Sequence, residues 1–132
     1  MTVPGPVIEA DSATAPFFAA AARDRLLLPR CVSCGTWHPP EVATCCGPLE
    51  WVPAAGRGVL VSWAVVHAAP HPAFADSLPF RTALVELAEG PWLQVRLTGA
   101  EPATPVAGSP VRITFAHPAE GASYPVGTLE GP

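Results

Sequence analysis

CVSCGTWHPPEVATCC, residues 31–46, contains all four cysteines of the chain. Cys31 and Cys34 have the two-residue spacing of a zinc knuckle, and the glycine that follows permits a tight reversal that turns both thiolates inward. Cys45 and Cys46 have no spacer, and adjacent side chains on an extended chain point in opposite directions. The second pair can therefore ligate one metal ion only if the backbone bends between the two residues.

Three interpretations of this segment stay open. The first is a zinc site made by Cys31, Cys34 and one or both of Cys45 and Cys46, with His38 as a substitute ligand. The second is a degenerate loop without metal. The third, a disulfide, requires an oxidising compartment. The N-terminal MTVPGPVIEADS lacks the basic start and apolar stretch of a signal peptide, so we expect a cytoplasmic protein with reduced thiols, which favours metal over a disulfide.

Length and charge limit the class of protein. At 132 residues the chain can bury a core as one domain, or as a small module attached to a larger one. Its net charge of −4 argues against a nucleic-acid partner, because binding to phosphates requires a basic surface. No stretch approaches the roughly eighteen consecutive apolar residues of a transmembrane helix, so we expect no membrane partner.

Helical signals are confined to the N-terminal part. SATAPFFAAAARDR offers cap candidates and an early proline, and predicts a short helix over residues 15–24 with Phe17 and Phe18 as packing residues. RLLLPRC predicts an extended segment, because Pro29 stops a helix. Residues 35–48 contain adjacent prolines and two glycines, and predict a loop.

Five segments in the second half of the chain have β-type composition or alternation. They are residues 58–67, 81–87, 92–98, 111–117 and, more weakly, 123–128. Glycine and proline clusters separate them, which is typical of short strands joined by turns. The pattern predicts a mainly β chain with one short helix and a small barrel.

A series of motifs follows in order from residue 17 to about residue 128. PFFAAAARDRLLLPRCVSCG is followed by WHPP, TCCG, LEW, GRG and VSWAVVH, and later by LPFRTALVELAEGPWL and RLTG. This order resembles the zinc-ribbon/OB-fold proteins associated with acyl-CoA enzymes, long known as a domain of unknown function. That family usually has two residues between the second pair of cysteines, whereas Cys45 and Cys46 are adjacent. The departure bears on the metal and not on the fold.

The resemblance implies a division into three parts. We expect an N-terminal lead and helix over residues 1–28, a rubredoxin-like zinc ribbon over residues 29–53, and a five-stranded OB-fold barrel over residues 54–132. The ribbon would hold a structural zinc ion on the cysteines named above.

The resemblance also implies an accessory role. Such proteins are partner subunits of thiolase-like enzymes, including acyltransferases, condensing enzymes and retro-aldolases that act on CoA thioesters. The small subunit supports the partner and can border the channel in which the CoA arm lies. The chain carries no recognisable nucleophile–base signature, so we expect it not to be an enzyme without its partner.

The expected CoA-facing residues lie in the matching motifs: Arg57, Ser62, Val66, His67, Pro79 and Phe80. Arg57, within GRG, is the candidate for a phosphate contact, with a solvated turn residue as the alternative. Val66 also has a structural alternative, because alternate residues of a half-buried strand face the core.

Two other functions are weighed against the accessory subunit. One is a free-standing module that binds or shuttles acyl-CoA. The other is an oligonucleotide-binding OB-fold, which the acidic composition disfavours because such folds use a basic groove with aromatic side chains. The four tryptophans are many for so short a chain, and we expect at least one to be exposed as part of an assembly surface.

Overall fold

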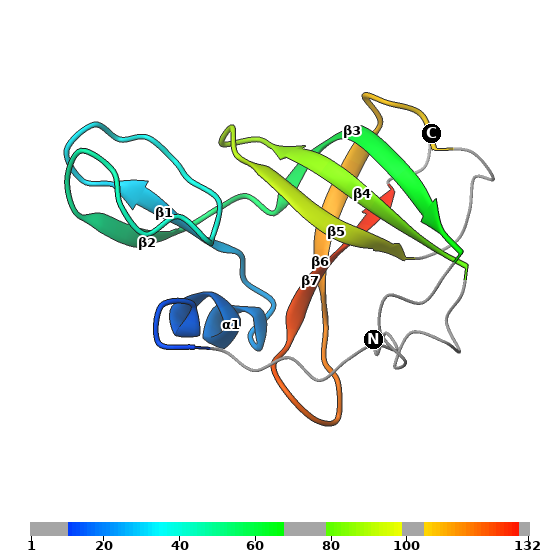
Figure 1. Cartoon of the computed structure of the whole chain (residues 1–132), viewed down its shortest axis with the longest axis horizontal. Coiled ribbons are helices and arrows are strands. Elements are labelled where there is room, and N and C mark those ends of the chain that lie inside the picture. Colours follow the sequence, from blue (N-terminus) through cyan, green and yellow to red (C-terminus); the bar gives the residue numbers. More distant parts are fainter. Residues whose placement is uncertain (1–10, 68–78, 99–104, 130–132) are drawn as a thin grey trace.

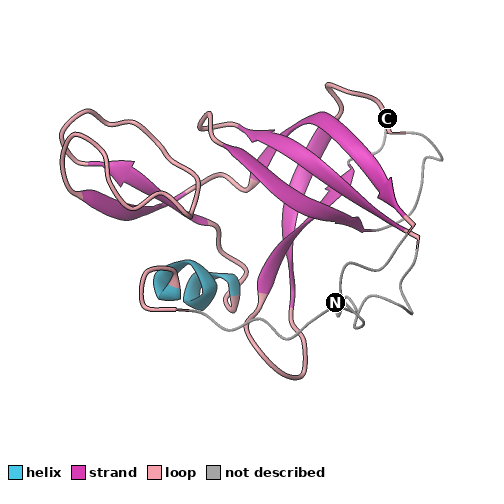
Figure 2. Cartoon of the chain, in the orientation of Figure 1, coloured by secondary structure: helices cyan, strands magenta, loops and turns pink. Residues whose placement is uncertain are grey.

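The computed structural model describes residues 11–67, 79–98 and 105–129, which form a two-stranded ribbon, a helix and a barrel (Figure 1). In chain order the elements are α1 (Ala15–Ala21), β1 (Leu27–Cys31), β2 (Leu49–Pro53), β3 (Arg57–Val66), β4 (Phe80–Leu87), β5 (Trp92–Thr98), β6 (Pro110–Ala116) and β7 (Tyr124–Leu129). Strands dominate the described part of the chain, as Figure 2 shows. The predicted mainly β fold with one short helix is confirmed.

Helix α1 begins where it was predicted and ends three residues early. Pro16 lies in its first turn, where a missing N–H costs nothing. Its end at Ala21, instead of the predicted residue 24, follows from the backbone of Asp24, which has a φ of 58° and has left the helical region. Phe17 is buried and Phe18 is half-buried, so both pack as expected.

The ribbon consists of β1 and β2, which pair antiparallel from Leu27 opposite Pro53 to Cys31 opposite Leu49. Pro29 had predicted an extended segment at β1, whereas no local pattern had predicted β2. LEWVP is only five residues long and ends in a proline, so it has too little alternation to predict a strand. The loop between the two strands carries the remaining cysteines.

The barrel is closed, with the strand order β3-β4-β5-β7-β6. Neighbouring strands are antiparallel apart from β5 and β7, which run parallel. The register of β3 on β4 shifts between Leu60 and Ser62, and such a bulge bends the ten-residue strand around the barrel. All five predicted barrel strands are confirmed, with ends displaced by no more than one residue.

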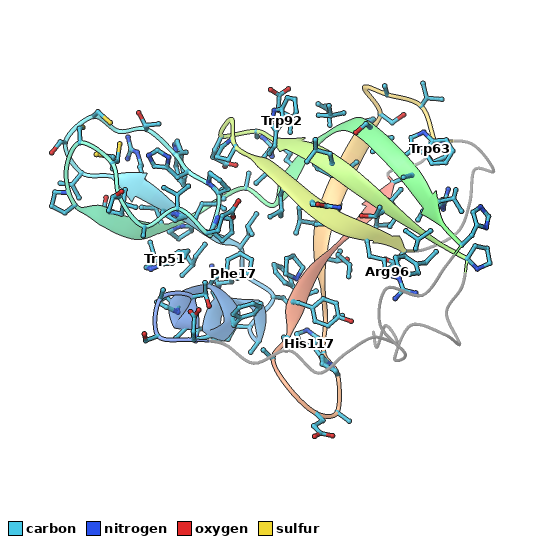
Figure 3. The ribbon with its side chains drawn as sticks, in the orientation of Figure 1. Phe17, Trp51, Trp63, Trp92, Arg96 and His117 are labelled. Atoms are coloured by element: carbon cyan, nitrogen blue, oxygen red, sulfur yellow. The ribbon has the colours of Figure 1, made fainter. Side chains whose placement is uncertain are left out.

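Helix, ribbon and barrel share one hydrophobic core. Phe17 of α1 and Leu28 of β1 belong to the same buried cluster as Leu60 and Val85 of the barrel. The ring of Trp51 in β2 lies 6.5 Å from that of Phe17, between ribbon and helix (Figure 3). The division into parts at residues 28/29 and 53/54 stays a prediction, and its first ten residues lie outside the described ones. Among the described residues, no helix has the length and apolarity needed to cross a bilayer.

Candidate metal centre and ligand-facing residues

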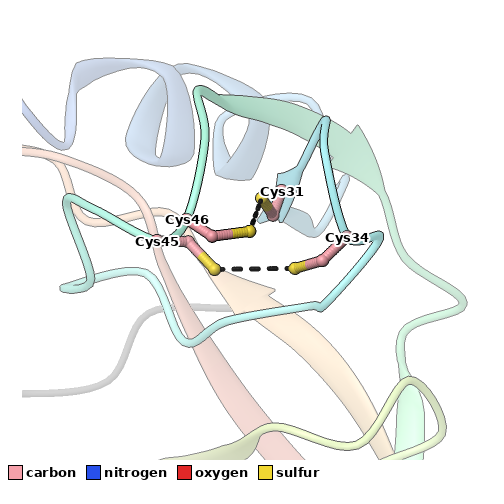
Figure 4. A group of neighbouring side chains, drawn as sticks. All are labelled: Cys31, Cys34, Cys45 and Cys46. Atoms are coloured by element: carbon pink, nitrogen blue, oxygen red, sulfur yellow. Dashed lines mark hydrogen bonds between the residues drawn. The ribbon is translucent and has the colours of Figure 1, made fainter.

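The four cysteines meet at one end of the ribbon (Figure 4). Their sulfur atoms all lie within 4.8 Å of one another. Cys31 Sγ is 3.6 Å from Cys46 Sγ, and Cys34 Sγ is 3.7 Å from Cys45 Sγ. Each sulfur of the first pair therefore faces one of the adjacent cysteines, and both members of the second pair point into the cluster.

The backbone supplies the bend that adjacent cysteines require. The first knuckle closes through a hydrogen bond from the Gly35 N–H to the Cys31 carbonyl, 2.8 Å long. The second is held against it by the Val32 N–H, which donates to the Pro48 carbonyl at 2.9 Å. Gly47 permits the close approach, because a Cβ there would collide with the side chain of Ser33. The missing spacer thus does not separate the two thiols.

The spacing of the sulfur atoms fits a tetrahedral metal site. Zinc–sulfur bonds of about 2.3 Å place ligand sulfurs about 3.8 Å apart, close to the two distances found between the pairs. A disulfide needs about 2.05 Å, and all four cysteines are free thiols. The cluster is therefore a group that could hold one metal ion.

The four thiols differ in acidity. Hydrogen bonding to the side chain and backbone of Thr36 lowers the pKa of Cys34 to about 6. Contacts with Cys34 and Cys31 raise the pKa of Cys46 to about 12, because a further thiolate beside existing ones is disfavoured. A bound divalent cation removes this repulsion and displaces the remaining protons. The donor set therefore suits a cation better than it suits four free thiolates.

His38 is not part of the cysteine group. Its Nε2 atom is buried and has no hydrogen-bond partner among the described residues, while its backbone N–H donates to the Pro29 carbonyl. The substitute ligand considered from the sequence is thus unnecessary to complete a four-sulfur site.

Arg57 lies at the start of β3 between two glycines, and the backbone requires a glycine at both positions. Gly56 has a φ of 77°, which glycine adopts without strain. Gly58 lies against β4, and a Cβ there would collide with the Glu86 carbonyl oxygen. Arg57 itself is exposed. The backbone therefore explains both glycines of GRG and leaves the arginine side chain at the surface.

Four of the other predicted CoA-facing residues gather at the opposite end of the barrel. Val66 and Phe80 are cross-strand partners, with His67 and Pro79 next to them in the chain. The Phe80 ring is covered by the guanidinium of Arg96, 4.5 Å from its centroid. Sequence reasoning missed Arg96, because it lies on β5, far along the sequence from Pro79 and Phe80.

The predicted residues do not form one site. Arg57 and His67 stand at the two ends of β3, about 30 Å apart at the usual rise of an extended strand. Ser62 lies between them, in a hollow of about 240 Å³ that it shares with Thr82 and Gln94. A ligand group bound at Arg57 is therefore distinct from one bound at the Val66–Phe80 end.

A larger hollow adjoins Arg57, with a volume of about 570 Å³. It is lined by Arg23, Arg25 and Arg112 as well as Arg57. Sequence reasoning missed this group, because three segments that are far apart in the chain contribute its members and only the fold brings them together.

Two side-chain contacts of His117 connect segments that are far apart in the sequence. His117 Nδ1 lies 2.8 Å from Ser123 Oγ, and His117 Nε2 lies 2.7 Å from Asp24 Oδ1. His117 thus ties the turn after α1 to the connection between β6 and β7 (Figure 3). The backbone of that turn is held by its own hydrogen bonds, from the Arg23 and Arg25 N–H groups to the Ala20 carbonyl and from the Asp24 N–H to the Ala21 carbonyl.

Sequence comparisons place these features among known proteins. A family model described as "ChsH2, C-terminal OB-fold domain" matches residues 51–116. The chain is 42% identical over 112 residues to the probable enoyl-CoA hydratase alpha subunit of Thermomonospora curvata. It is 36% identical over 105 residues to the 3-oxo-4,17-pregnadiene-20-carboxyl-CoA hydratase alpha subunit of Mycobacterium tuberculosis. These alignments include 82% and 77% of this chain but 34% and 33% of the relatives, so it spans about a third of their length.

Two solved structures of DUF35 proteins resemble this chain. A chain of the "Ltp2-ChsH2(DUF35) aldolase" is 35% identical, with a TM-score of 0.78 over 91% of this chain and 96% of that one. A protein of unknown function from the DUF35 family of Sulfolobus solfataricus is 15% identical, with a TM-score of 0.60 over 92% and 85% of the two chains. The second likeness concerns the fold alone.

Proposed function

The chain belongs to the ChsH2 C-terminal OB-fold (DUF35) family, and from this premise we propose that it is a non-catalytic accessory subunit of a thiolase-fold enzyme acting on CoA thioesters. The partner would be an acyltransferase, a condensing enzyme or a retro-aldolase. The chain would stabilise this partner and border the channel that holds the CoA arm.

One observation carries the proposal. The chain matches 96% of a DUF35 chain whose structure is named as one component of an Ltp2-ChsH2 aldolase. The curated relatives are named as alpha subunits of hydratases with CoA substrates, which also supports a role beside another subunit. Because the chain spans about a third of those relatives, the hydratase activity in their names is not carried over.

We assign the cysteine cluster to one structural zinc ion. Four sulfur ligands with two pair distances of 3.6 and 3.7 Å suit zinc, which prefers tetrahedral thiolate sites. The ion would hold the two knuckles together at the end of the ribbon. Four protein ligands leave no position for substrate, so the metal would contribute to folding and not to catalysis.

The CoA-facing role divides between the two ends of the barrel. Arg57 is exposed and suited to a phosphate, since an arginine offers paired donors to an anion. Val66, His67, Pro79 and Phe80 would instead border the channel near the partner. Ser62 lies between these two places on β3.

The test is co-expression with a thiolase-fold protein encoded beside this chain, followed by co-purification and assay. We expect a stable complex, activity toward CoA thioesters in the complex, and none in the isolated chain. A chain that binds acyl-CoA but never associates with such a partner would support the free-standing binding module instead. Turnover by the isolated chain would refute the non-catalytic role.

A further inference from the structure

Thr36 contacts both cysteines of the first knuckle. Its Oγ1 atom lies 3.1 Å from Cys34 Sγ, and its carbonyl accepts a hydrogen bond from the Cys31 N–H at 2.9 Å. Thr36 directly follows the turn that the Gly35 N–H closes by donating to the Cys31 carbonyl. One residue outside the cysteine cluster therefore bonds to the backbone of one ligand and to the sulfur of the other.

The sulfur of Cys34 differs from the other three in its partners. The cysteine sulfurs face one another across the cluster at 3.6 and 3.7 Å. Within the described part of the chain, the Thr36 hydroxyl is the one side-chain hydrogen-bond partner that any of these sulfurs has outside the cluster. Cys34 and Thr36 are both exposed, whereas Cys31 is buried. Thr36 thus adjoins a ligand that water can reach.

The direction of this hydrogen bond depends on the state of the thiol. A free Cys34 thiol donates its hydrogen to Thr36 Oγ1. A metal-bound cysteine is a thiolate and has no hydrogen to donate. A threonine hydroxyl can then rotate and donate instead, because it is both a donor and an acceptor. The same contact therefore serves the free thiol and the metal-bound thiolate.

A donor at this place favours the metal-bound state. Four thiolates outweigh the charge of one divalent cation, so the occupied centre carries negative charge. Hydrogen bonds to charged groups are stronger than those between neutral groups. Partners of metal ligands commonly change metal affinity by about 10- to 100-fold when they are replaced. Because Thr36 is exposed and water competes for the same sulfur, we expect an effect at the lower end of this range.

We propose that Thr36 is a positioning residue of the metal centre, whose hydroxyl donates a hydrogen bond to Cys34 Sγ and so raises the affinity of the four cysteines for their ion. The inference rests on the assignment of a zinc ion under the proposed function. It adds a fifth residue to the four that bind the metal directly.

Zinc affinity of the full chain tests the inference, measured by competition with a chromophoric chelator. Thr36→Val keeps the β-branched shape and removes the hydroxyl. It should weaken zinc binding by about tenfold, whereas Thr36→Ser, which keeps a hydroxyl, should stay within about threefold of the unchanged chain.

Thr44→Val is the matched control. Thr44 is exposed and directly precedes a cysteine of the second pair, and its hydroxyl has no sulfur partner among the described residues. The substitution therefore removes the same group from beside a ligand without removing a hydrogen bond to sulfur. Its zinc affinity should equal that of the unchanged chain.

Cobalt substitution separates the hydrogen bond from a general effect on the turn. Divalent cobalt can occupy tetrahedral thiolate sites, and its sulfur-to-metal charge-transfer absorption moves to lower energy when a ligand sulfur loses a hydrogen bond. We expect this band at longer wavelength in Thr36→Val and at its original wavelength in Thr36→Ser and Thr44→Val. A residue that supported only the backbone of the turn would not move the band while the site stays tetrahedral.

The outcomes distinguish this inference from the zinc assignment. Unchanged zinc affinity and an unmoved cobalt band in Thr36→Val, in a chain that binds both ions, would overturn the inference and leave the metal assignment in place. Equal losses of affinity in Thr36→Val and in either Thr36→Ser or Thr44→Val would also overturn it. A chain that binds neither ion would refute the zinc assignment, and the role of Thr36 with it.

Discussion

At Gly58, near the start of the barrel, β3 and β4 approach so closely that there is no room for a side chain. A Cβ at this position would collide with the Glu86 carbonyl of the adjacent strand. We expect Gly58→Ala to lower the free energy of unfolding by about 1–3 kcal/mol, because the two strands must separate locally. Urea unfolding measures this. Val59→Ala, at the exposed neighbouring position, should cost about 1 kcal/mol or less, and equal costs would contradict the steric explanation.

The cysteines give a prediction about metal. The chain purified without added metal should contain about one zinc per molecule, and chelation should destabilise it. Cys31→Ala should lower the free energy of unfolding by about 3 kcal/mol or more, because Cys31 is 1% exposed and structural zinc contributes directly to folding. Elemental analysis and chemical unfolding measure these effects. Ser33→Ala, within the same knuckle, is the control, and less than about a tenth of stoichiometric zinc would support a metal-free loop.

His67 separates a binding role from a catalytic one. It is exposed and follows β3 directly. In the complex with a partner, we expect His67→Ala to leave kcat within about threefold of the unchanged protein, since uniform binding contacts alter KM and not the chemical step. Steady-state kinetics with a CoA thioester measures both. Loss of turnover with unchanged substrate binding would make His67 part of the active site.

Tyr124, the only tyrosine, provides a pH-dependent prediction. Burial raises its pKa above 10. Below pH 10 the phenol is neutral in both states and its contribution to stability is fully present. As the pH rises through the folded pKa, the unfolded state loses the proton first and stability falls. Tyrosinate absorbance should therefore appear at higher pH in the folded than in the urea-unfolded chain, and Tyr124→Phe should abolish the signal; coincident titrations would contradict the burial effect.

Individual elements show what the sequence could predict and what it could not. The five barrel strands alternate or are rich in valine, so local pattern was sufficient. The end of α1 was missed because the left-handed cap is Asp24, where the sequence pattern of a helix end calls for glycine. The cysteine cluster was expected, but the closeness of Cys45 and Cys46 depends on a bend that spacing alone cannot predict. The basic hollow was missed entirely, because three distant segments build it.

The outer face formed by β3, β4 and β5 exposes apolar side chains. Val59 is 39% exposed and Trp92 is 52% exposed, and both pair with Glu86 of the strand between them. The expectation that at least one tryptophan is exposed is thereby confirmed. Tryptophan is enriched at the energetic centres of interfaces, so we predict that this face contacts the partner.

Trp92→Ala should therefore weaken association with the partner by about tenfold or more, since truncating a central tryptophan commonly costs over about 1.4 kcal/mol. Calorimetric titration of the two proteins measures this. Val32→Ala is the control, because Val32 is 60% exposed but follows β1 in the ribbon and not in the barrel. Equal affinity for both variants would locate the interface elsewhere.

The whole described chain should unfold as one unit. Leu28 in the ribbon and Leu60 in the barrel belong to one buried cluster, so neither part keeps its core when the other unfolds. We expect coincident transitions by tryptophan fluorescence and far-ultraviolet circular dichroism, and chelation of metal should lower the midpoint of both. Two separate transitions would instead support independent ribbon and barrel domains at the predicted boundary.

The position of β7 has a consequence for how the protein is made. β7 lies between β5 and β6 in the barrel, although it follows both in the chain. Until β7 has left the ribosome, β5 and β6 each present an unpaired edge, and such edges promote aggregation. Barrel closure is therefore a late event in translation, and a partner that recognises the closed barrel can associate only with chains whose synthesis has passed Leu129.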